Sequence, residues 1–439
     1  MSELLSSPDT IYAPASGFGR AAVCVVRISG PRASDILVRM AGGAPEPRRM
    51  SLRRLVDPRD GDILDHALVV WLPAPHSFTG EDQAELQIHG GLAVRQAVLS
   101  ALSAIEDCRP AEPGEFTRRA LLAGRMDLTA AEGLADLVDA ETEGQRRQAL
   151  RQLGGGLGAL ADEWRSELIR VQALLEAALD FADEGDVPES LEEEARAAAI
   201  RLGAAIEGLL AEGRRGERLR EGFHVVLAGP PNAGKSTLLN ALARRDVAIV
   251  SSVPGTTRDI IETRCDLDGL PVIFADTAGL RETAESVEQQ GVARARGRID
   301  QADLVLWLDP ADDRAPPPDG LARRLHVVTK IDLAGDREFP EADAAICAVS
   351  GDGLPALLET LASAARAAMG AGDALVTRER HRVALEAALA GVSRGVSLSE
   401  TELFAEEIRL AARALGRVSG RVDVEDVLDQ LFSSFCIGK

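Results

Sequence analysis

The residues best suited to chemistry lie in one short loop around a lysine. Residues 229–236 read Gly-Pro-Pro-Asn-Ala-Gly-Lys-Ser, the spacing G-x-x-x-x-G-K-[ST], between a strand-like apolar run and a helical stretch. In that context the N–H groups at the start of a helix can hold phosphates. Lysine occurs three times in the chain, against 46 arginines, so a chance match is improbable. We expect Lys235 to contact the β- and γ-phosphates of a nucleotide and Ser236 to bind Mg²⁺.

A second segment indicates that the nucleotide carries guanine. Thr329-Lys330-Ile331-Asp332 follows an apolar run. The carboxylate of Asp332 offers two acceptor oxygens to the N1 and amine hydrogens of guanine, which adenine cannot match. The usual form of this motif begins with asparagine, so Thr329 lacks one side-chain amide. Cys347-Ala348 stands where small GTPases have Ser-Ala, which would bring the Ala348 N–H to the guanine oxygen.

A third segment bears on hydrolysis. Asp276-Thr277-Ala278-Gly279 also follows an apolar run, so Asp276 could hold the metal through water and the Gly279 N–H could reach the γ-phosphate. The next position is Leu280, which cannot orient water as the glutamine of Ras-like proteins does. The charged stretch from Arg281 to Gln290 is either an ordinary solvated surface or the source of one carboxylate that polarises the water.

The composition is that of an ordinary globular protein with roughly two to four domains. The net charge of −21 argues against unaided binding of nucleic acid, and the 3% aromatic content argues against recognition by base stacking. The five cysteines are scattered without metal-ligand or redox spacing, and neither a signal peptide nor an apolar run of membrane-spanning length is seen. We therefore expect a cytoplasmic protein that has no membrane partner.

Periodicity divides the chain into four parts. Residues 1–120 mix strand and helix patterns, and residues 121–219 are helical. Residues 220–373 alternate short apolar runs with helices, which predicts a mainly parallel sheet, and residues 374–439 are helical again. The expected fold is multidomain, α/β and α, in which an α/β domain is inserted into a helical domain behind an N-terminal α+β domain.

Particular elements are also expected. In the N-terminal part these are strands at Val23–Ile28, Ala67–Leu72 and Ala84–His89 and a helix at Leu92–Ile105. A long amphipathic helix should run from Leu150 to Leu175, with either a break or a close helix contact at the glycines 154–156. The buried strands of the inserted domain are expected at Phe223–Ala228, Pro271–Ala275, Leu304–Leu308, Leu325–Val328 and Ala344–Val349.

Motifs along essentially the whole chain resemble those of the MnmE (TrmE) tRNA-modification GTPases. In the inserted and C-terminal parts they are Asn232, Gly255-Thr256-Thr257-Arg258-Asp259, Asp276-Thr277-Ala278-Gly279-Leu280-Arg281 and Phe435-Cys436-Ile437-Gly438-Lys439. In the N-terminal part they are Asp9-Thr10-Ile11, Arg27-Ile28-Ser29-Gly30, residues 77–82 and residues 113–117. The resemblance implies a folate-binding N-terminal domain, a helical domain and an inserted Ras-like P-loop G domain.

The resemblance also implies a potassium ion that does what an arginine finger does elsewhere, by neutralising charge that develops on the phosphates. Its ligands would be Asn232 and, largely through backbone carbonyls, Ser251, Val253 and Thr256, with serine at 251 where the family has threonine. Thr257 would bind Mg²⁺ and the γ-phosphate.

Glu288, by its register from Asp276, matches the family's catalytic glutamate and would position water. With Lys235 and Cys436 it makes up the implied catalytic set. The implied GTP-binding set is Asn232, Ala233, Gly234, Lys235, Ser236, Thr237, Ser251, Ser252, Val253, Pro254, Gly255, Thr256, Thr257, Asp276, Thr277, Ala278, Gly279, Thr329, Lys330, Asp332, Cys347 and Ala348.

The N-terminal domain of the family binds a tetrahydrofolate derivative (5-formyl or 5,10-methylene) at a dimer interface. Arg27, Glu85 and Arg125 match its ligand positions, and Lys439 would reach the same pocket. Arg125 replaces a lysine of the relatives. A polar strand face that carries Glu85 suits a pterin, although an exposed salt bridge is the simpler alternative for both Glu85 and Arg125.

The function implied is that of a potassium-dependent GTPase that acts as a homodimer. It would form a heterotetramer or larger complex with an FAD-containing partner of the MnmG type, and only the partner would bind FAD. Together they would place an aminomethyl or carboxymethylaminomethyl group on C5 of the wobble uridine (position 34) of certain tRNAs. The alternative is an Era-like ribosome-assembly GTPase, which would need a basic RNA-binding domain. A free-standing folate-dependent aminomethyl transferase would leave the phosphate loop unexplained.

Overall fold

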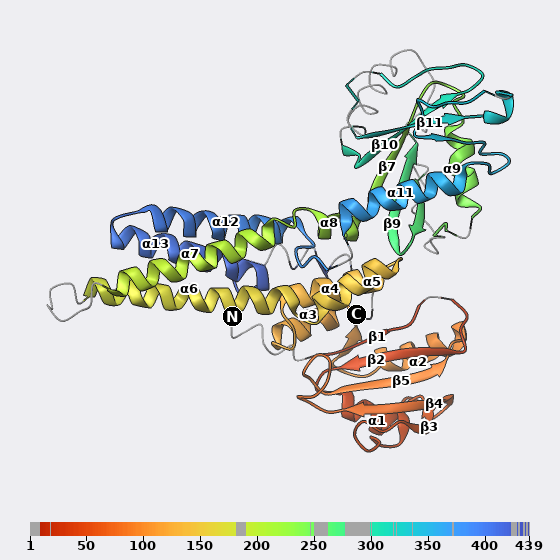
Figure 1. Ribbon diagram of the computed structural model, residues 1–439. Helices are drawn as coiled ribbons and strands as arrows, with labels where there is room; N and C mark the ends of the chain where they lie inside the picture. The colour runs from red at the N-terminus through yellow and green to blue at the C-terminus, as the bar shows by residue number, and fades with distance from the viewer. Residues whose placement is uncertain are drawn as a thin grey trace, which may run out of the picture. The chain divides into compact units, whose positions relative to one another are not determined.

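The structure is a computed structural model that describes residues 9–17, 19–180, 190–245, 247–249, 262–276, 299, 301–318, 320–321, 323–335, 337–370, 373–422, 428, 431–432, 435 and 438. The chain forms two compact units. Unit 1 comprises Met1–Ala135, Leu157–Ser166 and Arg413–Lys439, and unit 2 comprises Asp136–Gly156 and Glu167–Ala412. Figure 1 shows the elements of both units.

Unit 1 contains a six-stranded sheet in the order β3-β4-β5-β2-β1-β6. Neighbouring strands are antiparallel except β1 and β6, which are parallel. The strands are β1 (Thr10–Pro14), β2 (Val23–Ser29), β3 (Ser51–Val56), β4 (Ile63–Leu72), β5 (Gln83–His89) and β6 (Cys108–Pro110). The helices that begin in this unit are α1 (Ala33–Ala41), α2 (Leu92–Ser103), α3 (Glu115–Leu122) and α4 (Leu128–Asp139).

The sheet of unit 1 has one apolar face and one polar face. Apolar side chains of α1 and α2, such as Ile36 and Leu102, form a buried core with strand residues such as Val26, Ile28 and Leu86. Because side chains alternate along a strand, the residues between these face the other way. The expected strands and helix therefore correspond to β2, β4, β5 and α2, although β4 begins four residues earlier and α2 ends at Ser103.

Unit 2 contains a second six-stranded sheet in the order β12-β11-β10-β7-β9-β8. It is parallel except where β8 pairs antiparallel with β9. The strands are β7 (Phe223–Ala228), β8 (Glu262–Leu267), β9 (Leu270–Asp276), β10 (Leu304–Pro310), β11 (Arg324–Thr329) and β12 (Ala344–Ala345). The expectation of a mainly parallel sheet is confirmed, but the last expected run, Ala344–Val349, is a strand only at Ala344–Ala345 because the chain turns there.

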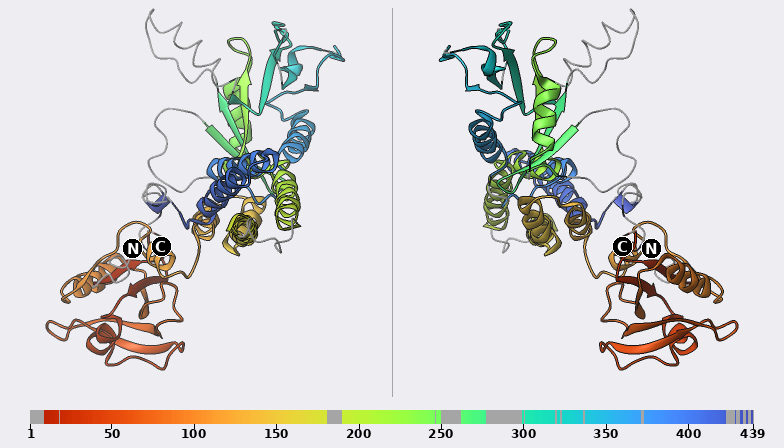
Figure 2. Two further views of the ribbon diagram at one scale, coloured as in Figure 1. Left: turned by 90° about the vertical axis from the view of Figure 1, so that its left-hand side faces the viewer. Right: turned by 90° about the vertical axis from the view of Figure 1, so that its right-hand side faces the viewer.

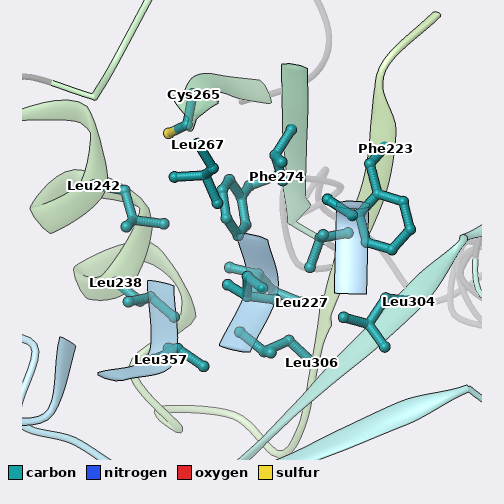
Figure 3. Packing of buried hydrophobic residues seen from close by; sticks show 14 of the residues in the cluster. Phe223, Leu227, Leu238, Leu242, Cys265, Leu267, Phe274, Leu304, Leu306 and Leu357 are labelled. Atoms are coloured by element: carbon teal, nitrogen blue, oxygen red, sulfur yellow. The ribbon is translucent and has the colours of Figure 1, made fainter. Parts of the chain in front are cut away.

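Two helices cover one face of this sheet. They are α9 (Lys235–Ala243) and α11 (Leu354–Met369). Figure 3 shows Leu238 of α9 and Leu357 of α11 in one cluster with Leu227, Phe274 and Leu306 of the strands. The packing fixes where α9 begins, and hence where the lysine loop lies.

The remaining helices are α5 (Glu143–Leu153), α6 (Gly156–Asp180), α7 (Ser190–Leu210), α8 (Arg215–Glu221), α12 (Glu379–Ser397) and α13 (Thr401–Ser419). In unit 2, α7 packs along α12 (Figure 1, Figure 2). Of the two alternatives at residues 154–156, the break is confirmed, because α5 ends at Leu153, Gly155 has φ +82° and α6 begins at Gly156. No helix within the described ranges combines the length and apolar character that crossing a membrane requires. The fold class is confirmed, whereas the four domain boundaries stay predictions.

Candidate nucleotide-binding site

The lysine loop connects the end of β7 to the start of α9, and two glycines make this turn possible. Gly229 has φ +138°, and a Cβ there would lie 2.3 Å from the carbonyl oxygen of Leu308. Gly234, with φ +93°, is the N-cap of α9. A side chain at either position would be strained, so both glycines are required by the backbone path.

The ammonium group of Lys235 is held inside the loop that it closes. Its Nζ donates to the carbonyl oxygens of Gly229 at 2.9 Å and Pro230 at 2.8 Å. The residue is only 8% exposed. The compact positive charge therefore lies beside the N-terminus of α9, where the partial charge of the helix also favours an anion.

A hydroxyl and a carboxylate meet next to the lysine. Ser236 Oγ donates to Asp276 Oδ2 at 3.3 Å, and Asp276 is buried at the end of β9. The two residues, 40 positions apart, come together because β7 and β9 are neighbours in the sheet. Hard oxygen ligands of this kind, few in number and completed by phosphate oxygens, suit Mg²⁺. The residues therefore fit the metal that the sequence predicts.

Thr329, which replaces the usual asparagine, has a clear structural role. Its hydroxyl donates to the carbonyl oxygen of Ala233 at 2.8 Å, and both residues are buried. The bond ties the end of β11 to the lysine loop. Sequence reasoning noted only the lost amide and missed this link, because nothing local connects residues 96 positions apart.

Asp332 lies in the single-turn helix η1 (Ile331–Leu333) directly after β11 and is exposed. The chain returns to the same place at Ile346, whose carbonyl oxygen accepts from the Ile331 N–H at 3.3 Å. The Cys347 side chain is buried and Ala348 is half-buried. The carboxylate and the Ala348 backbone thus belong to one region, as base recognition requires.

These segments enclose a cavity of about 650 Å³. It is lined by Pro231, Asn232, Ala233, Gly234, Lys235, Ser236, Thr237, Thr329, Lys330, Asp332, Leu333, Cys347, Ala348 and Val349. Eleven of the predicted site residues therefore share one cavity, and Asp276 contacts it through Ser236. Their individual roles stay predictions.

Other predicted residues lie outside the described part of the chain. They are Ser251, Ser252, Val253, Pro254, Gly255, Thr256, Thr257, Thr277, Ala278, Gly279, Glu288, Cys436 and Lys439.

Two of the predicted folate ligands in unit 1 bind each other. Arg27 and Glu85 are cross-strand partners on β2 and β5, and Arg27 Nε lies 3.1 Å from Glu85 Oε1. The guanidinium of Arg27 also lies over the rings of Phe78, at 5.5 Å, and Phe116, at 5.8 Å. Both charged side chains keep about a fifth of their surface exposed. The salt bridge weighed as the simpler alternative thus exists for Glu85, while binding of a ligand stays a prediction.

Arg125 occupies a different setting. It is exposed, and its side-chain carbons lie beside Gly80.

Sequence reasoning missed a buried ionic network behind Gly80. Arg119, 7% exposed, donates to Asp9 and Glu81 and to Glu115. Burial raises the pKa of Glu115, but hydrogen bonds from Arg109, Arg119 and a backbone N–H outweigh it and hold the pKa below its ordinary value. The motif segments 77–82 and 113–117, which served only to indicate a resemblance, meet in this network.

A cavity of about 390 Å³ adjoins the network. It is lined by Thr79, Gly80, Glu81, Arg109, Glu112, Glu115, Arg118, Arg119, Leu122 and Ala123.

The fold and the site define a class: a P-loop protein whose inserted G domain is built to hold a guanine nucleotide. Two family models match the chain, "MnmE helical domain" over residues 128–436 and "GTP-binding protein TrmE N-terminus" over residues 10–125. The chain belongs to the MnmE (TrmE) family of tRNA-modification GTPases, enzymes that hydrolyse GTP. The resemblance drawn from the motifs is therefore confirmed.

Individual relatives agree with this assignment. The tRNA modification GTPase MnmE of a Methylobacterium species is 63% identical over 98% of this chain and 100% of its own length. That of Methylorubrum populi is 61% identical over 98% of both chains. Among solved structures, the G domain of the T. maritima FeoB iron transporter is 24% identical over 33% of this chain and 98% of its own, with a TM-score of 0.25. The family assignment does not depend on that last likeness.

Proposed function

We propose that this chain is a potassium-dependent GTPase that modifies the wobble uridine of certain tRNAs together with a flavin-containing partner of the MnmG type. The group added at C5 is aminomethyl or carboxymethylaminomethyl, with its one-carbon unit taken from a tetrahydrofolate derivative. The observation that carries the proposal is one cavity lined by Lys235, Ser236 and Asp332, with Asp276 hydrogen-bonded to Ser236 behind it. The chain's relatives are named tRNA modification GTPases.

Within this site we assign each residue a role that its chemistry allows. Lys235 and the N–H groups at the start of α9 bind the phosphates, and Asp332 binds the guanine edge. Ser236 and Asp276, which are hydrogen-bonded to each other, would hold Mg²⁺ through their oxygen atoms. Mg²⁺, when bound, neutralises charge between the β- and γ-phosphates. Leu280 cannot orient water, and we assign that task to Glu288 because its register from Asp276 matches the catalytic glutamate of the family.

Potassium is proposed on the strength of Asn232. This residue lines the cavity, is exposed and has φ +63° in the lysine loop. Its amide oxygen is a suitable ligand for a monovalent cation beside phosphates, with Ser251, Val253 and Thr256 as the further ligands. An Era-like switch is not favoured, because the matches to the MnmE family extend through the N-terminal and helical parts of the chain.

The homodimer and the folate site are proposed for the sheet of unit 1. The face opposite α1 and α2 carries the Arg27–Glu85 pair, and exposed apolar residues lie on the same face, with Leu52 of β3 opposite Leu68 of β4. A second copy would cover these side chains and bring the ligand groups to an interface. The net charge of −21 suits a protein that leaves much of the tRNA contact to its partner.

The proposal is tested by reconstitution with purified protein, the flavoprotein partner, tRNA, a methylene-tetrahydrofolate and GTP, in KCl or in NaCl. Released phosphate and the wobble nucleosides, the latter by mass spectrometry, are measured in parallel. We expect several-fold faster phosphate release in KCl, and modified wobble uridine only when GTP is present. A chain lacking Lys439 should hydrolyse GTP normally yet leave the uridine unmodified.

A different result would contradict each part of the proposal. Equal phosphate release in the two salts would remove potassium from the mechanism. Full hydrolysis beside an unmodified wobble uridine would contradict the tRNA reaction, and modification by the shortened chain would contradict the role of Lys439.

A further inference from the structure

Lys330, in the cavity, is held by a carboxylate from another loop. Its Nζ lies 3.0 Å from both Oδ1 and Oδ2 of Asp312. Lys330 has φ +56°, an uncommon conformation for a residue with a side chain, and this directs the chain sharply into η1. The ion pair is accessible to solvent, with 32% of the Lys330 side chain and 37% of the Asp312 side chain exposed.

The loop that carries Asp312 is anchored at its far end. Asp309, fully buried at the end of β10, accepts from the Ala315 N–H at 2.7 Å and from Arg314 Nε at 2.8 Å. The carboxylate of Asp309 is itself fixed, because His326 Nε2 lies 2.9 Å from it. The loop is therefore tied to the sheet, and so is the position of Asp312.

The near end of the loop is anchored to the residue before Lys330. The Ala311 N–H donates to the carbonyl oxygen of Thr329 at 2.9 Å. The carboxylate of Asp312 thus belongs to the same rigid piece of structure as the backbone of Lys330, and the ion pair closes a short loop between them.

The position of the ammonium group limits which part of Lys330 can face a nucleotide. Lys330 lines the cavity with Asp332, whereas Asp312 is not among the lining residues. With the ammonium group drawn to Asp312, the aliphatic stem of Lys330 is the part that extends along the wall. Long charged side chains commonly bury their stems against apolar surface while the head binds elsewhere.

We infer that Asp312 is a positioning residue for the nucleotide site, which holds the stem of Lys330 extended as a wall for the flat face of the base. The inference rests on the proposed guanine-nucleotide site and adds to it a residue outside the lysine loop and outside the segments that carry Asp276, Asp332 and Ala348. Fixing the side chain before the base arrives removes the need to order it on binding, which strengthens affinity. Asp312 affects the contact with the flat face of the base and not the contacts with the phosphates. It should therefore strengthen the binding of GTP, GDP and ITP by the same factor.

The simpler interpretation is an ordinary ion pair at the surface. Such pairs contribute little to stability, so this interpretation predicts that removing the carboxylate changes neither unfolding nor nucleotide affinity. A positioning role predicts unchanged unfolding together with weaker binding.

The test compares Asp312→Asn with Asp313→Asn, a matched control in the same loop whose side chain is exposed. Dissociation constants for GTP, GDP and ITP are measured by titration calorimetry, together with thermal unfolding. We expect Asp312→Asn to weaken all three nucleotides by the same factor, about two- to fivefold, with an unchanged unfolding midpoint. Asp312→Glu should recover part of the loss, and Asp313→Asn should bind like the unsubstituted protein.

A double-mutant cycle shows whether Asp312 acts through the lysine. Lys330→Met keeps an unbranched apolar stem but removes the ammonium group, so adding Asp312→Asn to it should cause no further loss. An undiminished effect of Asp312→Asn in that background, or no effect in the original protein, would overturn the inference while leaving the proposed function intact. Absence of GTP binding by the unsubstituted protein would instead contradict the proposed function, and this inference with it.

Discussion

The hydroxyl of Thr329 connects two parts of the site with different tasks. In the proposed function the lysine loop binds the phosphates, and the segment after β11 binds the base. The hydrogen bond from Thr329 Oγ1 to the Ala233 carbonyl oxygen, at 2.8 Å and buried, holds one against the other. An asparagine would have a longer reach and a second donor, but the single hydroxyl is enough to satisfy the buried carbonyl.

Thr329→Val tests this link, because valine has the same shape and no hydroxyl. The Ala233 carbonyl would be left without that partner, which should cost about 1–3 kcal/mol and weaken GTP and GDP alike. Urea unfolding and nucleotide titration measure the two effects. Thr329→Ser keeps the hydroxyl and should lose less than half as much; equal losses in the two variants would show that packing, and not the hydrogen bond, matters.

How far the site could be predicted depends on how local its chemistry is. The lysine loop is contiguous, so spacing alone indicated Lys235 and Ser236, and Asp332 follows from the same reasoning. The contacts of Thr329 with Ala233 and of Lys330 with Asp312 join residues 96 and 18 positions apart. No periodicity connects such pairs, because sheet order and loop path bring them together.

At the scale of elements, the turn between β8 and β9 packs on the start of α5. The Gly144 N–H donates to the Gly269 carbonyl oxygen at 2.8 Å, and Arg264 of β8 pairs with Glu141 at 3.1 Å. Thr142 and Gln145 form a capping box that fixes where α5 begins. β8 was missed in the sequence because it alternates polar and apolar residues at the sheet edge, unlike the uniformly apolar inner strands.

Gly144→Ala should destabilise the protein even though alanine favours helices. A Cβ at this position would lie 2.8 Å from the Gly269 carbonyl oxygen and 3.1 Å from Leu219 Cδ1, so the turn must move away at a cost of about 1–3 kcal/mol. Gly208→Ala in α7 is the control, because a Cβ there meets nothing within 4 Å. That change should stabilise by up to about 1 kcal/mol. Thermal unfolding of both variants should show midpoints shifted in opposite directions, and a raised midpoint for Gly144→Ala would contradict the close contact.

At the scale of the whole molecule, the pattern of apolar and polar residues predicted the sheets and helices better than it predicted the surfaces that a partner could cover. The parallel sheet and the polar face of β5 follow from which residues avoid water, and the break before α6 follows from the low helix propensity of glycine. The strands β1, β3 and β6 were not predicted: β3 carries two adjacent arginines, and β6 has only three residues. An exposed apolar surface on a sheet depends on how several strands pair. The one in unit 1 becomes visible only when the pairing of β3 with β4 places Leu52 opposite Leu68.

The proposed homodimer makes a prediction about that face. Leu52 is 68% exposed and Leu68 is 40% exposed on neighbouring strands, on the side of the sheet away from Leu55 and Val69 in the core. If a second copy covers this strip, Leu52→Glu would bury an unpaired charge and weaken the dimer by about tenfold or more. Val38→Glu is the matched control, since Val38 is 56% exposed on α1, which packs on the opposite face of the sheet. Sedimentation equilibrium should show dissociation for Leu52→Glu alone, and an unchanged dimer would place the interface on another surface.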